Sequence, residues 1–235
     1  MSTGLIIFAR MGSRRLPGKM LLPIAGRPLL GRIIDRARCA SGDYPIVVAT
    51  STEAGDDTIE RFARNEGVEV FRGSRDDVAA RALACCDVHG FDRFARICGD
   101  RPFLPWELID ELRGIAEEDD LDLASNVVEK TYPTGTTTEI VATSALRRVL
   151  ERTFDRQDRE HITRYIYAKP EGFRVVNRSS GQQGWRLLNL AIDDQADVER
   201  TEWILARLKP EPERARLEDV IAVATEWAAG KEVEV

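Results

Sequence analysis

Short runs of β-branched and other apolar residues alternate with longer amphipathic segments in the first half of the chain. The runs have the character of buried strands and cover residues 5–8, 46–49, 68–71 and 93–97. Apolar residues recur at helical spacing in residues 29–40, 56–66, 76–88 and 106–117. Strands that alternate with helices in this way form right-handed βαβ units on a mostly parallel sheet. We therefore expect an α/β fold.

The alternation becomes irregular after residue 126. Residues 136–141 are rich in threonine and alternate in polarity, which predicts a hairpin or an edge strand. Further helices are expected at 144–151, 159–168, 196–208 and 217–229, and strands at 173–176 and 187–192. We interpret residues 1–235 as a single domain that carries an inserted subregion at about 128–186.

The composition excludes several classes of protein. Of 235 residues, 43% are apolar, which is enough for a packed core, and the formal net charge is −6. A mildly acidic chain without a long basic run is a poor nucleic-acid binder. No apolar stretch approaches the roughly 18 residues of a membrane-spanning helix. The four cysteines show no CxxC spacing. We expect a reduced, cytoplasmic protein without nucleic-acid or membrane partners.

The segment after the first expected strand, residues 9–19, is rich in glycine and basic residues. It contains Gly12, Gly18, Arg10, Arg14, Arg15 and Lys19. Glycine lets backbone N–H groups approach phosphate oxygens, and the cations supply charge at the sheet edge where α/β proteins bind ligands. The spacing of the glycines excludes a Walker A loop, and GxGxxG is absent. The segment predicts a triphosphate site; a flexible, solvated loop is the alternative.

Two aspartates follow expected strands and could meet at the same edge of the sheet. Asp100 comes after the strand at 93–97, and Asp193 comes after the run at 187–192. Carboxylates from different strands suit Mg²⁺, which prefers oxygen ligands and shares its coordination with substrate phosphates. Helix capping is the alternative, in which Asp193 or Asp194 begins the helix near residue 196.

Several ordered blocks of sequence resemble the cytidylyltransferases that activate acidic sugars. The blocks are MGSRRLPGK at 11–19, VATS at 48–51, FRGSRDDV at 71–78, GDRP at 99–102, DREHIT at 158–163, and Asp193. The family includes the 3-deoxy-manno-octulosonate and acylneuraminate cytidylyltransferases. The chain is most similar to the branch named for spore-coat polysaccharide biosynthesis, and the likeness extends to about residue 208.

The resemblance implies a three-layer, Rossmann-like nucleotidyltransferase fold. It also implies transfer of a cytidylyl group from CTP to an acidic small-molecule acceptor, with Mg²⁺ as cofactor and release of pyrophosphate. Its metal ligands correspond to Asp100 and Asp193, and the catalytic residues to Lys19, Arg10 and Asp100. The expected nucleotide-binding residues are Ala9, Arg10, Gly12, Ser13, Arg15, Lys19, Thr50, Ser74 and Asp100. Thr50 and Ser74 would line the cytosine pocket, or serve only in turns after strands.

Four residues on expected helices are candidates for the substrate side of the site. Asp77 and Arg81 are four apart, so they form either a surface ion pair or a contact with the acceptor or ribose. His161 lies among cations on the helix at 159–168. It is either a structural residue or, with Arg159, part of a site for an acceptor carboxylate or phosphate.

Two further substrate residues and one departure come from the resemblance. Tyr132 belongs to a loop that resembles the family's acceptor-side loop, and Arg101 stands where relatives often have a small residue. After Asp193, the usual Thr-Pro-Glu-Asp is replaced by Asp-Gln-Ala-Asp at 194–197. Whether Asp194 or Asp197 joins the metal site is therefore open at this stage.

The acceptor is also open, because a sugar acid, a sugar phosphate, a phosphorylated small molecule or a phosphonate would suit an arginine-lined pocket. Other functions compatible with the sequence are transfer of a different nucleotide, glycosyl transfer, and non-catalytic nucleotide binding. The inserted subregion corresponds to the place where relatives form a dimer, so we expect a homodimer.

Overall fold

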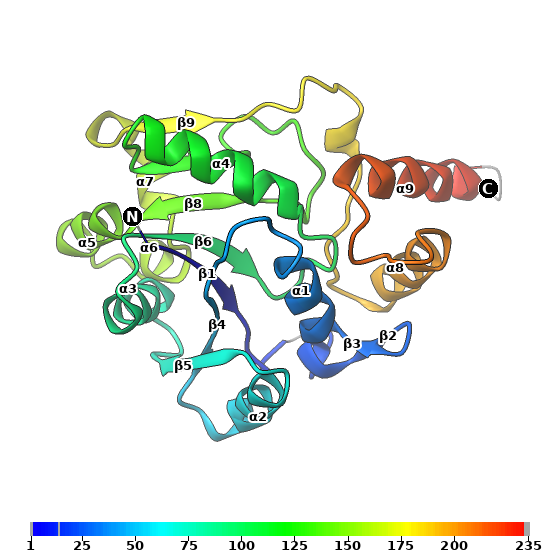
Figure 1. Cartoon of the computed structure of the whole chain (residues 1–235), viewed down its shortest axis with the longest axis horizontal. Coiled ribbons are helices and arrows are strands. Elements are labelled where there is room, and N and C mark those ends of the chain that lie inside the picture. The colour runs from blue at the N-terminus through cyan, green and yellow to red at the C-terminus, as the bar shows by residue number, and fades with distance from the viewer. Residues whose placement is uncertain (1, 14, 233–235) are drawn as a thin grey trace.

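The computed structural model describes residues 2–13 and 15–232, and at its centre is a seven-stranded sheet (Figure 1). The strand order is β5–β4–β1–β6–β8–β7–β9. These strands are β1 (Thr3–Phe8), β4 (Ile46–Ser51), β5 (Glu69–Gly73), β6 (Arg93–Cys98), β7 (Leu123–Ser125), β8 (Glu139–Ala142) and β9 (Val175–Asn177). A separate two-stranded ribbon joins β2 (Pro23–Ile24) and β3 (Arg27–Pro28).

Most neighbouring strands of the large sheet run parallel, as the alternating pattern predicts. β1 pairs in parallel with β4 and β6, β4 with β5, and β7 with β9. β8 is antiparallel to both β6 and β7. The carboxyl ends of β1, β4, β5 and β6 therefore meet at one edge of the sheet, where open α/β sheets bind ligands.

Helices cover both faces of the sheet, which gives three layers. One face carries α1 (Leu29–Ala37), α2 (Asp57–Asn65) and α4 (Trp106–Glu118). The other face carries α3 (Val78–His89), α5 (Thr143–Arg152) and α7 (Arg164–Ala168), with the short α6 (Arg156–Glu160) next to α3. The last helices, α8 (Gln195–Arg207) and α9 (Leu217–Glu232), pack against each other beside α1.

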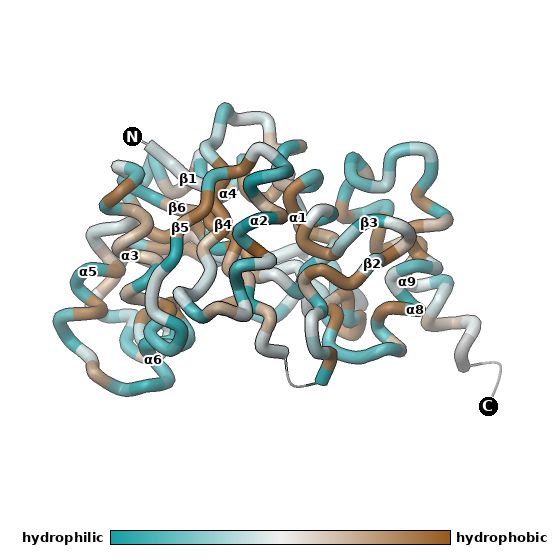
Figure 2. The backbone as a smooth tube through the Cα atoms, turned by 90° about the horizontal axis from the view of Figure 1, so that it is seen from below, coloured by the Kyte–Doolittle hydropathy of each residue, from teal (hydrophilic) through white to brown (hydrophobic). Residues whose placement is uncertain are grey.

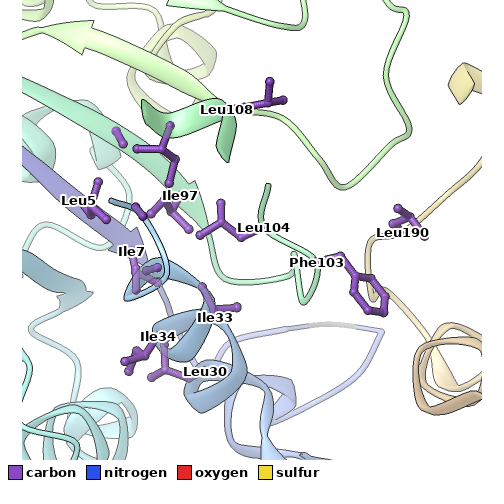
Figure 3. Packing of buried hydrophobic residues seen from close by; sticks show 14 of the residues in the cluster. Leu5, Ile7, Leu30, Ile33, Ile34, Ile97, Phe103, Leu104, Leu108 and Leu190 are labelled. Carbon is purple, nitrogen blue, oxygen red and sulfur yellow. The ribbon is translucent and has the colours of Figure 1, made fainter. Parts of the chain in front are cut away.

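Strand β1 shows why the sequence forms this core. Side chains alternate between faces along a strand, so Leu5 and Ile7 point to the α1 and α4 layer while Ile6 points to the α3 layer. All three are fully buried. Figure 3 shows Leu5 and Ile7 packed with residues of α1 and β6. In Figure 2, the hydrophobic strands lie between the two helical layers.

Three expectations for the second half of the chain are corrected by the structure. Residues 139–142 form β8, which is antiparallel to the preceding strand β7 as in a hairpin but lies inside the sheet rather than at its edge. The helix expected at 159–168 is two helices, α6 and α7, interrupted at residues 161–163. Residues 187–192 form no strand, because their backbone bonds to loops: Leu190 N–H donates to Thr134 and Ile192 N–H donates to Asp100.

Residues 128–186, expected as an inserted subregion, include β8 and β9 of the main sheet together with α5 to α7. This range therefore helps to build the sheet that supports the site. Within the described part of the chain, no helix is long and apolar enough to cross a membrane.

Candidate active site

A buried carboxylate fixes the start of the basic loop after β1. Asp56 accepts a hydrogen bond from the Met11 backbone N–H at 2.7 Å and others from the backbone and hydroxyl of Ser51. Burial tends to raise the pKa of Asp56, but the hydrogen bonds outweigh it, so its pKa lies below the usual value. The ionised carboxylate thus holds the loop against the end of β4.

The conformation at the end of the loop directs the side chain of Lys19 toward the interior of the protein. Gly18 has φ 72°, a left-handed conformation that favours glycine, and it precedes a 3₁₀ turn at Lys19–Leu21. The side chain of Lys19 is 13% exposed. Its Nζ donates to the Ile192 carbonyl at 2.8 Å and lies 3.4 Å from Asp193 Oδ1 and 3.8 Å from Asp100 Oδ2. The predicted phosphate-binding lysine therefore joins the two predicted metal ligands.

The two aspartates come from separate segments that are tied together by the backbone. Asp100 follows β6, and its carbonyl accepts the Ile192 N–H at 2.9 Å. Arg15 Nη2 lies 2.9 Å from Asp193 Oδ1. Asp100 Oδ1 is buried and makes no hydrogen bond to a described residue. The structure thus brings Arg15, Lys19, Asp100 and Asp193 together, while Arg14 lies outside the described residues.

The neighbouring aspartates have a different role, which the sequence left open. Asp194 is the N-cap of α8 and accepts the Asp197 N–H at 3.0 Å. Asp197 completes a capping box by accepting the backbone N–H groups of Asp193 and Asp194 at 2.7 and 3.2 Å. Its other oxygen accepts Arg200 Nη1 at 2.6 Å. Hydrogen bonds at the start of α8 therefore occupy Asp197, whereas Asp193 faces Lys19 and Arg15.

A cavity of about 670 Å³ lies over this carboxyl edge, and we call it the larger cavity. The predicted site residues that line it are Ala9, Arg10, Gly12, Ser13, Arg15, Lys19, Arg81, Asp100, His161 and Asp193. They come from the loop after β1, from α3, from the end of β6 and from the segments before α7 and α8. Most of the predicted nucleotide site therefore forms one continuous wall.

Thr50 and Ser74, predicted for the cytosine pocket, are not among the residues that line this cavity. Thr50 is fully buried in β4. Ser74 is exposed, and its hydroxyl accepts the Asp77 N–H at 3.1 Å. This hydrogen bond stabilises a turn after β5, which is the alternative role expected for Ser74.

The acceptor-side residues separate into different environments. Asp77 caps α3 by accepting the Ala80 N–H, and it pairs with Arg159 at 3.0 Å. The surface pair between Asp77 and Arg81 is therefore not formed, because Arg81 is buried and donates to the Ser74 carbonyl. Arg159 also donates to the carbonyls at 150 and 153, which ties α6 to the end of α5.

Tyr132 lies in the core rather than at a cavity wall. It is 8% exposed, and its ring meets Trp185 edge-on at 6.0 Å between centroids. The pKa of Tyr132 is raised by burial. Tyr132 therefore anchors its loop by packing against Trp185.

A second cavity of about 370 Å³ adjoins the larger one, and we call it the smaller cavity. His161 lines both, and Arg101 lines the smaller one. The remaining lining residues are Arg96, Val127, Thr137, Glu139, Thr163, Arg164 and Tyr167. Three arginines and one glutamate are among these nine residues, so arginine donors for an anion outnumber carboxylates in the lining.

Arg96 and Glu139 line the smaller cavity but were not predicted as site residues from the sequence. Arg96 Nη1 bonds to Glu139, which also accepts the Tyr167 hydroxyl. Burial tends to raise the pKa of Glu139, but Arg96 and the hydrogen bonds lower it, so the net pKa lies below the usual value. The available signal was an arginine in the middle of strand β6, between Ala95 and Ile97.

Comparison with known proteins agrees with this geometry. Residues 5–220 match the cytidylyltransferase family. The spore coat polysaccharide biosynthesis protein SpsF of Bacillus subtilis is 34% identical over 180 residues, covering 72% of each chain. The 3-deoxy-manno-octulosonate cytidylyltransferase of Alteromonas mediterranea is 34% identical over 112 residues, which are 48% of this chain and 45% of that one.

A solved structure of a cytidylyltransferase from Leptospira borgpetersenii superposes with a TM-score of 0.92 at 28% identity. The superposition covers 97% of this chain and 96% of the other. The predicted Rossmann-like nucleotidyltransferase fold is therefore confirmed. Because the family match extends over most of the chain, the protein belongs to the cytidylyltransferase family and is a CTP-dependent nucleotidyltransferase.

Proposed function

We propose that the enzyme transfers the cytidylyl group of CTP to an acidic small-molecule acceptor and releases pyrophosphate. The observation that carries the proposal is the pair of adjoining cavities, which share His161. The larger cavity is lined by Lys19 and the two aspartates, and three of the nine residues that line the smaller one are arginines. Donor and acceptor can therefore bind side by side.

In this proposal, Lys19, Arg10 and Arg15 bind the triphosphate. An acceptor oxygen attacks the α-phosphorus, and the bond from that phosphorus to the bridging oxygen of the β-phosphate breaks. Pyrophosphate leaves with the electron pair, and the acceptor proton passes to solvent. Such a transfer needs positioning and charge neutralisation rather than a protein nucleophile. Lys19 supplies this charge at a side chain that is only 13% exposed.

Asp100 and Asp193 are the residues that would hold Mg²⁺. Asp100 Oδ1 fits this role because it is buried without a hydrogen bond to any described residue. Among the described residues, no cluster of three or more His, Cys, Asp or Glu forms a closed metal site. A pair of carboxylates suits Mg²⁺, which completes its shell with phosphate oxygens and water. When bound, the ion would neutralise charge on the α-phosphate and the leaving group.

The smaller cavity is the proposed acceptor site. Arg96 is paired with Glu139, and Arg164 is paired with Asp155 and Asp158, so the cavity offers an acceptor the guanidinium donors of Arg101 and Arg164 and the imidazole of His161. Arg101 Nη1 donates to the Thr137 carbonyl at 2.8 Å, which positions this arginine between β6 and β8. A carboxylate, phosphate or phosphonate on the acceptor would bind these cations.

We place this reaction in the supply of precursors for glycan or surface polysaccharide, in the cytoplasm, with the enzyme as a homodimer. Light scattering at micromolar concentration checks the dimer. A monomer at that concentration would refute this part of the proposal without affecting the chemistry.

The deciding experiment is a pyrophosphate-release screen. Each of the four ribonucleoside triphosphates is combined with Mg²⁺ and a panel of sugar acids, sugar phosphates and phosphonates. We expect release with CTP and one class of acidic acceptor, and a CMP-linked product by mass spectrometry. Release that is equal with UTP, or no release with CTP across the panel, would contradict the proposal.

A further inference from the structure

Arg81 is a buried arginine that faces the larger cavity without a carboxylate partner. It lies in the first turns of α3, and its side chain is 3% exposed. Its guanidinium carbon lies 5.8 Å from the centre of the Phe8 ring at the end of β1. Within the described residues, no acidic side chain lies within ion-pair distance of Arg81, although it lines the cavity.

The hydrogen bonds of Arg81 leave one edge of the guanidinium free for a ligand. Nη1 donates to the Ser74 carbonyl at 2.9 Å, whereas Nε is buried and has no partner in the described part of the chain. Nε and Nη2 form the opposite edge, a fork of two parallel N–H donors. A buried donor without a partner costs roughly 1–3 kcal/mol, which a bound acceptor would offset.

The surrounding chain is built to accommodate this side chain. A Cβ at Gly73 would lie 2.9 Å from Arg81 Cγ, so the absence of a side chain at Gly73 makes room for the arginine stem. The loop that holds Nη1 is fixed in turn, because Ser74 Oγ accepts the Asp77 N–H and Asp77 pairs with Arg159. The guanidinium is therefore held in one orientation.

Arg81 and Asp100 lie on different sides of β1 in the cavity wall. α3 packs on β4 and β5, whereas Asp100 follows β6. Burial lowers the pKa of Arg81 to about 10, and the charged side chains that act on it are Arg10 and Asp56, both near the start of the loop after β1. A nucleotide with its phosphates at Lys19 and Asp100 would place its base toward α3.

The donor fork matches one pyrimidine better than the other. Cytosine presents two adjacent acceptors, O2 and N3, whereas uracil presents the O2 acceptor beside an N3–H donor. A guanidinium has donors only, so it cannot pair with the uracil N3–H. We propose that Arg81 is a specificity-determining residue that donates through Nε and Nη2 to the O2 and N3 edge of the cytosine base. This inference rests on the proposed function.

The test compares CTP and UTP in Arg81→Met and Arg81→Lys. Calorimetry gives the dissociation constants, and pyrophosphate release gives kcat/KM. We expect CTP binding to weaken by about 10- to 100-fold with little change for UTP, so the CTP/UTP ratio falls toward one. Arg81→Lys keeps the charge and the stem but loses the fork, so it should fold and lose the same preference.

Arg75→Met is the matched control, because Arg75 lines the same cavity and its loss removes one positive charge. We expect it to weaken CTP and UTP equally. Thermal unfolding checks that each variant is folded. If the folded Arg81 variants keep the wild-type CTP/UTP ratio, or raise only the KM of the acceptor, the inference is overturned. If the wild-type enzyme itself has no preference for CTP, the proposed function fails first.

Discussion

The ammonium group of Lys19 lies 3.4 Å from Asp193 and 3.8 Å from Asp100, so one cation joins the two aspartates proposed to hold Mg²⁺. Replacement of Lys19 by alanine removes the least exposed cation that contacts these aspartates. We expect kcat/KM for CTP to fall by about 10²- to 10³-fold while the fold is kept, since such a group acts on the charge of the transition state. Steady-state pyrophosphate release measures the loss, and near-normal turnover would exclude Lys19 from catalysis.

The same contact predicts an effect on metal binding. Lys19 and a divalent cation compete for the same carboxylate oxygens, so Lys19→Met should bind Mn²⁺ more tightly than wild type when CTP is absent. Electron paramagnetic resonance of free Mn²⁺ gives the affinity. Lys130→Met, on an exposed residue outside both cavities, is the control and should leave the affinity unchanged. Equal affinity in Lys19→Met and wild type would show that no such competition occurs.

Asp193 and Asp197 are four residues apart, but substitution by asparagine should affect turnover at the first and stability at the second. Asp193→Asn should reduce turnover strongly and change stability little, because the ion pairs of its carboxylate within the described residues are with the exposed Arg15 and with Lys19 of the proposed active site. Asp197→Asn disrupts the capping box of α8 and the bond to Arg200. We expect it to lower the free energy of unfolding by about 1–2 kcal/mol. Urea unfolding and activity assays on both variants test this division, and the reverse pattern would assign the metal to Asp197.

The basic loop should lose its anchor when Asp56 is replaced by asparagine. The folded-state pKa of Asp56 is below the unfolded value, so its ionised form contributes stability above the unfolded pKa, about 4. This contribution is lost as the pH falls through the folded pKa. We expect Asp56→Asn to cost about 1–3 kcal/mol at neutral pH and progressively less below about pH 4. Urea titrations from pH 3 to 7 measure the difference, and a cost independent of pH would contradict the assignment.

Gly73→Ala offers an independent check on the role of Arg81. The new Cβ would lie 2.9 Å from Cγ and 3.3 Å from Cβ of Arg81, which are the inflexible part of that side chain. The arginine must therefore shift, and the CTP/UTP preference should fall as in the Arg81 variants. Gly114→Ala is the control, because Gly114 lies in α4 outside both cavities and nothing lies within 4 Å of its added Cβ. An unchanged preference in a folded Gly73→Ala protein would show that the orientation of Arg81 does not matter.

The first half of the fold, and the meeting of the basic loop and Asp100 at one edge of the sheet, could be predicted from the sequence. Parallel strands end at the same edge of a sheet, so the pattern alone placed Lys19 and Asp100 near each other. The capping role of Asp197 could not be separated from a metal role, because both need an aspartate at the start of a helix. The segment before Asp193 has the composition of a strand, but its hydrogen bonds go to loops distant in sequence.

The smaller cavity was missed for a different physical reason. It is assembled from β6, β8 and the break between α6 and α7, which come together only through tertiary pairing. Arg96 lies between two apolar residues of β6, and the sequence does not indicate its partner because Glu139 is 43 residues away. A buried charge in a strand is costly without a partner, so such an arginine is a useful signal of a polar site.

The antiparallel insertion of β8 divides the active site into two parts that can change separately. Glu139, Thr137 and the α6–α7 segment belong to residues 127–167, whereas Lys19, Arg81 and Asp100 belong to the parallel half of the sheet. Substitutions at residues 127–139 and 163–167 could reshape the smaller cavity, which is the proposed acceptor site, without changing a residue that lines the larger cavity. A lineage of such enzymes could therefore acquire new acceptors by divergence at these positions, while Arg96, Arg101 and the shared His161 stay the same.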